Sequence, residues 1–276
     1  MIYGVDLLSQ WLEMGLLATS LWFLIQHLGL VSLGHAAFYG LAGYSLALLS
    51  QQTANFWLAL LGCLCVCGLF AAITGLLALR SKGLFFLMAT LAFAQMCFVL
   101  AFETNLFGGS DGLYLSRPNE GLIWSLKDPV NRLLMTVVVV TAWLLLLIRL
   151  QRSPYGSMLR AIHDNLSRVV SLGYEPMQFQ WLAYVLSGLM AGSAGFLHAL
   201  RFGFVSPQVF AWQTSGMALL MVLLGGRRPI WSGFAGAALV IALHETLSNT
   251  AWFGELAKHW LAALGLVMVF VALRRR

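Results

Sequence analysis

The chain has 276 residues, of which 60% are hydrophobic and only 9% are charged, and its formal net charge is +6. A soluble domain carries roughly 25% charged residues, so a soluble protein of this composition could not cover its surface with polar groups. The composition therefore excludes a soluble globular protein and predicts a polytopic membrane protein. Because the positive charges lie in short connections between apolar runs, they indicate membrane topology and not binding to nucleic acid.

Nine apolar runs follow one another and predict an all-α transmembrane helix bundle of about eight to ten segments, in one domain covering residues 1–276. A re-entrant pair near 30–40 is an alternative for the second run, because it leaves the downstream pattern intact. The second and seventh runs are short for a membrane span. The runs are about 9–30, 34–50, 56–79, 84–103, 130–148, 178–201, 209–224, 230–248 and 256–273.

The sixteen Lys and Arg residues divide unevenly between the two sides that these runs define. If each run crosses the membrane once, eleven fall on one side: Arg80, Lys82, Arg149, Arg152, Arg160, Arg168, Arg227, Arg228, Arg274, Arg275 and Arg276. The other five fall on the opposite side or at its edge: Arg117, Lys127, Arg132, Arg201 and Lys258. Cytoplasmic loops carry an excess of positive charge, so we expect the first set to be cytoplasmic, the N terminus outside and the C terminus inside.

The first residues predict no cleavable signal peptide. They lack a basic region and contain Asp6 and Glu13. We interpret them as a short non-cytoplasmic lead into the first span.

Neither a metal site nor a catalytic residue is expected. Cys63, Cys65 and Cys67 alternate in an apolar run, and on a helix Cys65 points away from the other two. An intramembrane enzyme built on His35 and on the pair His244-Glu245 would need a nucleophile, and the spacing pairs none with them.

The second run carries the motif V-S-L-G-H-A-A-F-Y-G-L-A-G-Y at 31–44, which is rich in glycine. Gly34, Gly40 and Gly43 are predicted to interrupt one long span. Broken helices occur within membranes only where protein or a cavity surrounds them, and their free backbone dipoles often meet solute. Two interpretations of this motif stay open. The glycines either allow tight packing around a kink, or they form a break in the helix that lines the solute path. On the second reading, Ser32 and His35 are the polar candidates.

Glu245 lies in the eighth run, next to His244. A carboxylate within an apolar helix is costly and by default indicates function. Its expected depth near the outer interface also fits a structural hydrogen bond. Glu245 therefore joins the translocation-path candidates Ser32, Gly34, His35, Gly40 and Gly43.

The connection from about 149 to 177 is the longest basic loop. Apolar residues at helical spacing predict a short amphipathic helix over 157–172, with Gly173 just past its end. Ser153 to Gly156 is interpreted as a turn before it. Such a helix serves either as an interfacial anchor on anionic lipid or as a docking element for a cytosolic partner.

This loop, S-P-Y-G-S-M-L-R-A-I-H-D-N, resembles the coupling loop of LivH/LivM-type permeases, most closely the LivM type. These are transmembrane subunits of ABC importers with a type II-like architecture. Further blocks agree in order over nearly the whole chain: 31–44, 107–113, 184–192, 203–207, 219–227 and the helix carrying His244-Glu245.

The resemblance implies an importer subunit without enzymatic activity and without a cofactor of its own. The implied partners are a second, LivH-like permease, two cytosolic ATPases that bind ATP and Mg, a periplasmic solute-binding protein and the lipid of a bacterial inner membrane. The positions matching the family's ATPase-docking helix are Arg160, Ala161, Ile162, Asp164, Asn165 and Gly173.

His163 and Leu166 depart from the family pattern, which often has a basic and an acidic residue at these positions. The implied solute is a branched-chain amino acid. Urea, amides and aromatic acids are alternatives carried by similar permeases, and an uncoupled channel or secondary transporter is a rival of another class.

Overall fold

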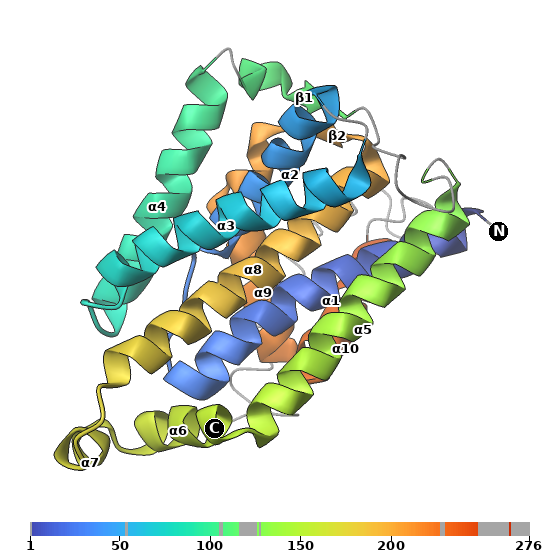
Figure 1. The fold of residues 1–276 in the computed structure, drawn as a ribbon. Coiled ribbons are helices and arrows are strands. Elements are labelled where there is room, and N and C mark those ends of the chain that lie inside the picture. Colours follow the sequence, from blue (N-terminus) through green and yellow to red (C-terminus); the bar gives the residue numbers. More distant parts are fainter. Residues whose placement is uncertain are drawn as a thin grey trace.

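The computed structural model describes residues 2–52, 55–104, 107–115, 126, 128–226, 230–247 and 265. Within these ranges, eight helices follow the first eight predicted runs (Figure 1). They are α1 (Ile2–Leu28), α2 (His35–Gln52), α3 (Phe56–Ala78), α4 (Leu84–Glu103), α5 (Pro129–Arg152), α8 (Pro176–Phe202), α9 (Trp212–Gly225) and α10 (Ser232–Leu247). The predicted ninth run, 256–273, lies outside the described residues except for Gly265.

Five helices are long and apolar enough to cross a membrane: α1, α3, α4, α5 and α8. α9 and α10 are shorter apolar helices. The prediction of a polytopic helical membrane protein is therefore confirmed. The basic residues Arg80 and Lys82 follow α3, at the same end of the bundle as the loop after α5 (Figure 1).

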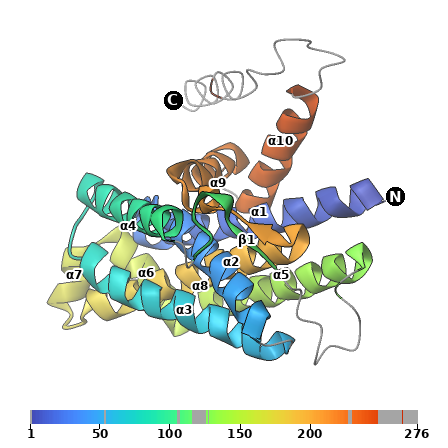
Figure 2. The ribbon, with the colours of Figure 1, turned by 90° about the horizontal axis from the view of Figure 1, so that it is seen from above.

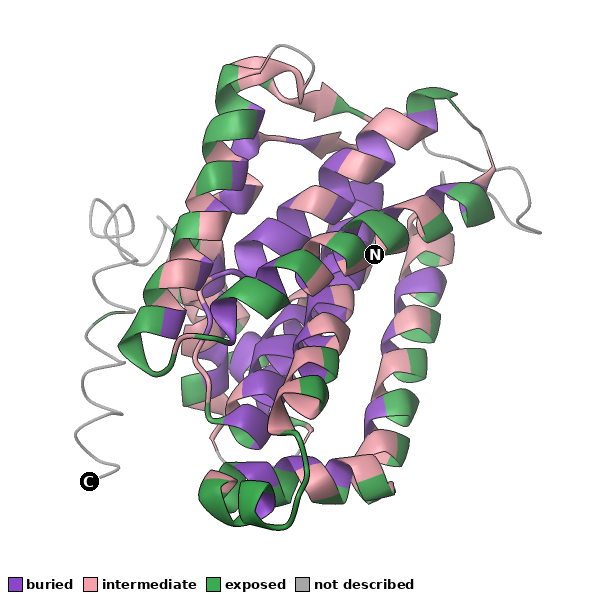
Figure 3. Cartoon of the chain, turned by 60° about the vertical axis from the view of Figure 1, so that its left-hand side comes forward, coloured by how far each residue is buried: buried purple, intermediate pink, exposed green. Residues whose placement is uncertain are grey.

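The bundle has a central layer of α1, α2 and α8, and a periphery that includes α3, α4 and α5. The buried share of the most apolar stretch is 67% in α1 and 72% in α8, but only 28%, 28% and 22% in α3, α4 and α5. Figure 2 shows α9 and α10 on one side of this centre, and Figure 3 shows the buried residues gathered in the middle. The exposed faces of α3, α4 and α5 carry Leu, Ile, Val, Phe and Met, which suits contact with lipid.

A ridge of small residues lets α8 approach its neighbours closely. At Gly192 on α8, the Cβ and Sγ atoms of Cys67 on α3 fill the space that a side chain would need. At Gly195, the backbone of Tyr39 on α2 fills the corresponding space. Side chains of Ala71 and Phe38 meet Gly188. Small residues at i and i+4 are the usual means of close helix contact in membranes. The packing partners of this ridge are therefore helices of the same chain.

The interruption predicted at three glycines occurs only before α2, between Leu28 and His35. α2 runs unbroken through Gly40 and Gly43, so a break at these two positions was a wrong prediction. The ring of Phe210 covers Gly40, and the Val205 side chain lies against Gly43. These contacts fill the space left by the missing side chains, and the helix keeps its own hydrogen bonds.

The end of the bundle opposite the basic loop is closed by short elements that the sequence did not predict. β1 (Leu113–Tyr114) pairs antiparallel with β2 (Phe204–Val205). The 3-10 turn η2 (Gly109–Asp111) precedes β1, and η3 (Pro207–Phe210) follows β2 and leads into α9. The glycine-rich segment 107–113 is thereby tied to the end of α8.

The close contact at Gly195 predicts that a larger residue there lowers the stability of the protein. Gly195→Ala places a methyl group against the Tyr39 backbone, which cannot yield as a side chain would. Forced overpacking costs about 1–3 kcal/mol, so we expect a lower melting temperature of the purified protein in detergent. Gly68→Ala is the matched control, because a methyl group there meets only the Leu189 side chain at an ordinary 3.4 Å. Equal melting temperatures for the two variants would contradict this packing.

Candidate functional site

The basic loop forms two helices, α6 (Pro154–Asp164) and α7 (Leu166–Ser171). The single helix predicted over 157–172 is wrong at Asn165, which has an extended backbone with φ −156° and ψ 91°. The Asn165 side chain accepts a hydrogen bond from the Arg168 amide at 3.0 Å. Asn is a strong helix N-cap, so this residue ends α6 and starts α7.

The predicted turn from Ser153 to Gly156 is the first turn of α6. Ser153 is the N-cap, and its hydroxyl accepts from the Gly156 amide at 3.3 Å. Pro154 follows at the first helical position, where its missing N–H costs nothing. Read as cap and N1 residue, Ser-Pro signals a helix start, and the turn prediction overlooked this.

The stop predicted at Gly173 is confirmed. Gly173 has φ +83°. Its amide donates to the Val170 carbonyl at 2.9 Å, and the Tyr174 amide donates to the Val169 carbonyl at 3.4 Å. These two bonds form a Schellman motif, in which glycine is favoured because its backbone is left-handed.

α6 is held firmly against the end of the bundle. Leu159 and Ile162 are buried, and the Tyr155 hydroxyl donates to the Phe179 carbonyl at 2.7 Å. Burial raises the pKa of Tyr155, so this hydroxyl stays a donor at neutral pH. Arg160 donates to the Gln151 carbonyl at 2.8 Å and to the Ser157 hydroxyl at 3.0 Å. The helix is therefore preorganised and does not depend on a partner for its position.

The predicted docking residues divide between two faces of this loop. Ala161, Asp164, Asn165 and Gly173 are exposed, as is the hydrogen-bonded Arg160. Ile162 faces the bundle and is buried. The predicted docking set is thus brought together on one short segment, with Ile162 as an anchor behind it.

Three apolar side chains that the sequence analysis did not select extend this exposed surface. Val170, Leu172 and Tyr174, in α7 and just after it, are all more than half exposed. Exposed apolar residues at a protruding tip mark an interaction surface. Of the three, only Leu172 belongs to the apolar stripe of the predicted helix, for which a lipid anchor and a docking element were the two interpretations.

α6 also touches the C-terminal end of α1. The His163 ring lies beside Gly29, which has φ +65° and directly follows α1. Within the ring, Nδ1 lies 3.6 Å from the Asp164 carboxylate. The residue that departs from the family pattern therefore contacts the start of the link between α1 and α2.

The path candidates in that link are buried. The Nε2 atom of His35 lies 2.9 Å from the Ser187 hydroxyl oxygen, and that hydroxyl donates to the Ser20 carbonyl at 2.8 Å. Because the Ser187 proton is used, His35 Nε2 is the donor. Ser32 accepts from the Gly34 amide at 3.1 Å. Their place in translocation stays a prediction; in this conformation His35 joins α2 to α8 and, through Ser187, to α1.

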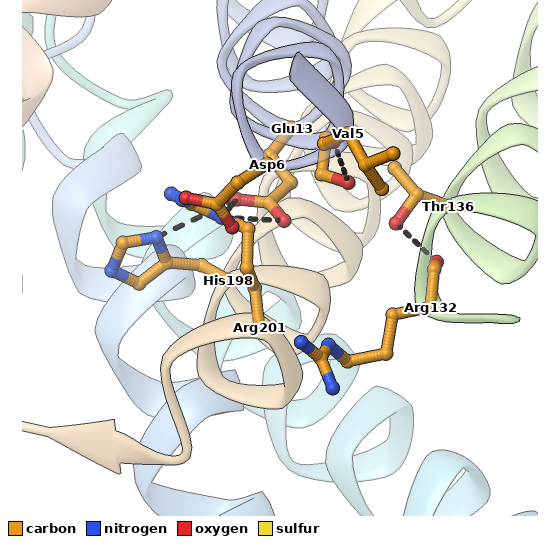
Figure 4. Close-up of polar contacts among 8 residues, drawn as sticks. Val5, Asp6, Glu13, Arg132, Thr136, His198 and Arg201 are labelled. Atoms are coloured by element: carbon orange, nitrogen blue, oxygen red, sulfur yellow. Dashed lines mark hydrogen bonds and ion pairs between the residues drawn. The ribbon is translucent and has the colours of Figure 1, made fainter. Parts of the chain in front are cut away.

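An ion-pair cluster inside the bundle was missed by the sequence analysis (Figure 4). Arg201 on α8 bonds Glu13 on α1 through Nε, at 3.0 and 3.2 Å to the two carboxylate oxygens. Its Nη1 lies 3.1 Å from Asp6. The Glu13 side chain is 0% exposed and that of Arg201 is 5% exposed, whereas Asp6 is 54% exposed. His198 Nδ1 lies 3.6 Å from Glu13.

A sequence signal for this cluster existed. Glu13 and Arg201 are opposite charges inside two different apolar runs, and such residues normally pair within the bundle. Asp6 and Glu13 had been interpreted only as evidence against a signal peptide. Among the described residues, no group of three or more His, Cys, Asp or Glu is arranged to hold a metal ion.

Glu245 lies toward the end of α10 and is partly exposed. Its carboxylate accepts from the Tyr3 hydroxyl at 2.5 Å and lies 3.7 Å from His244 Nδ1. The hydrogen bond joins α10 to the first turn of α1. This contact agrees with the interpretation of Glu245 as a structural hydrogen-bond partner, and its role in translocation stays a prediction.

Comparison with known proteins identifies relatives. The profile of a family described as "Branched-chain amino acid transport system / permease component" matches residues 4–272. The permease protein LivM of the high-affinity branched-chain amino acid transport system of Escherichia coli (strain K12) is 30% identical over 270 residues. LivM of Salmonella typhimurium is 29% identical over 270 residues. The autoinducer 2 import system permease protein LsrC of Photorhabdus laumondii is 26% identical over 145 residues, 48% of this chain and 41% of that protein.

The two LivM alignments cover 87% of this chain and 62% of each relative, so the chain spans less than two thirds of their length. No solved structure matches the chain significantly.

The buried pair yields a second prediction. Arg201→Ala takes the guanidinium away from the fully buried Glu13 carboxylate, and Glu13→Ala leaves Arg201 with only the half-exposed Asp6. Breaking a buried ion pair in this way costs about 3–5 kcal/mol. We expect each single variant to lower the melting temperature in detergent more than the double variant, in which no unpaired charge remains. Asp6→Asn is the control, because its half-exposed carboxylate contributes little. A double variant with the summed loss of both singles would contradict this coupling.

Proposed function

Because the chain belongs to the family of branched-chain amino acid transport permeases, we propose that it is the membrane-spanning permease subunit of an ABC importer. It moves branched-chain amino acids or a related small polar solute inward. The observation that carries the proposal is the preorganised loop of α6 and α7. Its outward residues, from Ala161 to Tyr174, are exposed although the helices themselves are fixed to the bundle.

This loop is the element through which partner ATPases drive the subunit. ATP binding closes the two ATPases, and their movement shifts α6 and α7. The contacts of α6 with α1 and α5 carry the shift into the bundle. Docking involves Ala161, Asp164 and Asn165 directly, together with Arg160 and Gly173, while Ile162 holds the helix in place. The part of the bundle that moves with this shift includes the residues predicted to line the solute path: Ser32, Gly34, His35, Gly40, Gly43 and Glu245.

The end that carries this loop faces the cytoplasm in our proposal. The basic residues that follow α3, end α5 or lie in the loop helices belong to this end: Arg80, Lys82, Arg149, Arg152, Arg160 and Arg168. Two basic residues, Arg132 and Arg201, lie toward the opposite end. The N terminus is then outside. The full assembly contains a second permease, two ATPases and a periplasmic solute-binding protein in a bacterial inner membrane.

Permeases of this architecture are named for different solutes. LivM relatives are named for branched-chain amino acids and the LsrC relative for autoinducer 2. Uptake of urea, amides or aromatic acids by the same architecture is the alternative, and binding measurements on the partner solute receptor decide among them. An uncoupled channel is the rival of another class, and uptake that continues without ATP would identify it.

The docking surface is tested with Ala161→Trp. Ala161 is exposed, so the larger side chain does not disturb the bundle but blocks a closely fitted partner. We expect solute-stimulated ATP hydrolysis and uptake by the complete transporter in proteoliposomes to fall about tenfold or more, a loss of about 1.4 kcal/mol of coupling.

Ser110→Trp is the matched control, since Ser110 is exposed at the opposite end. Unchanged uptake and unchanged stimulated ATP hydrolysis in Ala161→Trp would refute docking at this surface.

A further inference from the structure

A groove of about 330 Å³ runs between α3 and α5, with α8 as its floor. Its α3 wall consists of Trp57, Leu60 and Leu64, which recur three and four residues apart and therefore share one helix face. The α5 wall extends from Met135 to Leu146 on a face of the same kind. α3 packs on α8, and α5 packs on α1 and α8, so both walls are supported by α8.

The inner lining of this groove suits an apolar occupant. The Trp143 indole donates to the Ser193 hydroxyl at 2.9 Å, and that hydroxyl donates to the Leu189 carbonyl at 2.8 Å. The two polar groups of the inner lining are thus engaged by the protein, and a solute that brought its own polar groups here would lose hydrogen bonds with water. The rest of the inner lining is aliphatic or methionine: Leu60, Leu64, Met135, Val138, Val139, Ala142 and Leu146.

The dimensions of the groove match one hydrocarbon chain. At 1.5 Å per residue, the wall from Met135 to Leu146 is about 17 Å long. The volume spread over this length corresponds to a channel about 5 Å wide. An α-helix with its side chains is about 10–12 Å across, whereas packed carbon atoms lie about 4 Å apart. An extended acyl chain therefore fits this width, and a transmembrane helix of a partner does not.

The groove begins at the level of the lipid headgroups. Trp57 is the second residue of α3 and is 51% exposed. Polar residues surround this end of the helix, because Gln51 and Gln52 are exposed at the end of α2 and the Asn55 side chain caps α3. Tryptophan is enriched where a membrane meets water, and one leaflet supplies about 15 Å of hydrocarbon. The groove therefore spans about one leaflet, on the side opposite α6 and α7 (Figure 1).

We propose that this groove holds one acyl chain of a phospholipid from the leaflet opposite α6 and α7. The chain packs against both walls at once and supplies α5 with contacts that the protein does not, since only 22% of the most apolar stretch of α5 is buried. α5 continues through Ser153 into α6, so the lipid stabilises the helix that carries the basic loop. The site requires only that the chain spans a membrane and does not depend on docking of an ATPase.

The test is photolabelling of the full chain in phospholipid nanodiscs. A trace of phosphatidylcholine carries a diazirine either at the end of one acyl chain or near the headgroup, and labelled residues are identified by mass spectrometry. Ala142→Trp fills the groove from the α5 wall. Leu145→Trp is the matched control, because Leu145 is 59% exposed on the same helix and lies outside the groove.

We expect the chain-end probe to label Leu64 and Leu146 severalfold more than Leu61, which is exposed on α3 outside the groove. Ala142→Trp should remove this excess, and Leu145→Trp should leave it unchanged. Equal labelling of the groove and of Leu61 would mean that bulk lipid alone is present and would overturn the site. An equal loss of labelling in the two variants would overturn it as well.

The position of the probe along the lipid identifies the leaflet. The headgroup probe should label Trp57, and its appearance at Leu146 instead would overturn the assignment to the leaflet opposite α6 and α7. A photoreactive amino acid at Ala142, incorporated in cells, tests the occupant directly. Cross-linking of this position to another membrane protein in place of lipid would overturn the proposal.

Discussion

The ion pair between Glu13 and Arg201 is the interaction on which the position of α1 depends. Both side chains are withdrawn from water, and hydrocarbon offers no other partner for either charge. α1 is therefore fixed to α8 at one depth and in one rotation about its axis. In that rotation Met14, which directly follows Glu13, points to another side of α1, toward α9 and α10. A polar constraint inside the membrane thus decides which side of α1 faces α9 and α10.

From this fixed point α1 reaches both ends of the bundle. Its C-terminal end meets α6 at Gly29, where the His163 ring lies, and its N-terminal half packs beside α9 and α10. A tilt of α1 at the loop end would turn about the Glu13–Arg201 contact and change the packing against α9 and α10 at the other. Rigid helices transmit such displacements because packed cores deform little. The buried hydrogen bonds of His35 with Ser187 and of Ser187 with α1 lie between these two ends.

The helix bounds were predictable because lipid demands long apolar runs with backbone bonds satisfied inside each helix. α4 begins and ends at the predicted residues, and α3 ends one residue before its predicted end. The bounds of α1 were predicted wrongly, because it begins at Ile2 and includes the residues that were interpreted as a lead before position 9. Contacts between distant residues were not predictable in the same way: Glu13 and Arg201 are 188 positions apart, and no local pattern links them. The two-residue strands are too short for any alternation to show. At Asn165 the apolar spacing continues across the helix break, so periodicity alone favoured one helix where a side-chain cap produces two.

The glycines show the same division between local and distant causes. Gly173 was read correctly because a left-handed residue after a helix is a local requirement. Gly40 and Gly43 were read as interruptions, yet their cause is distant, since Phe210 and Val205 come from the chain near β2. A glycine in a membrane helix therefore indicates either backbone freedom or a neighbour's approach, and only the tertiary structure separates the two. Here the approach of η3 and β2 to α2 closes the end of the bundle that lies opposite α6 and α7.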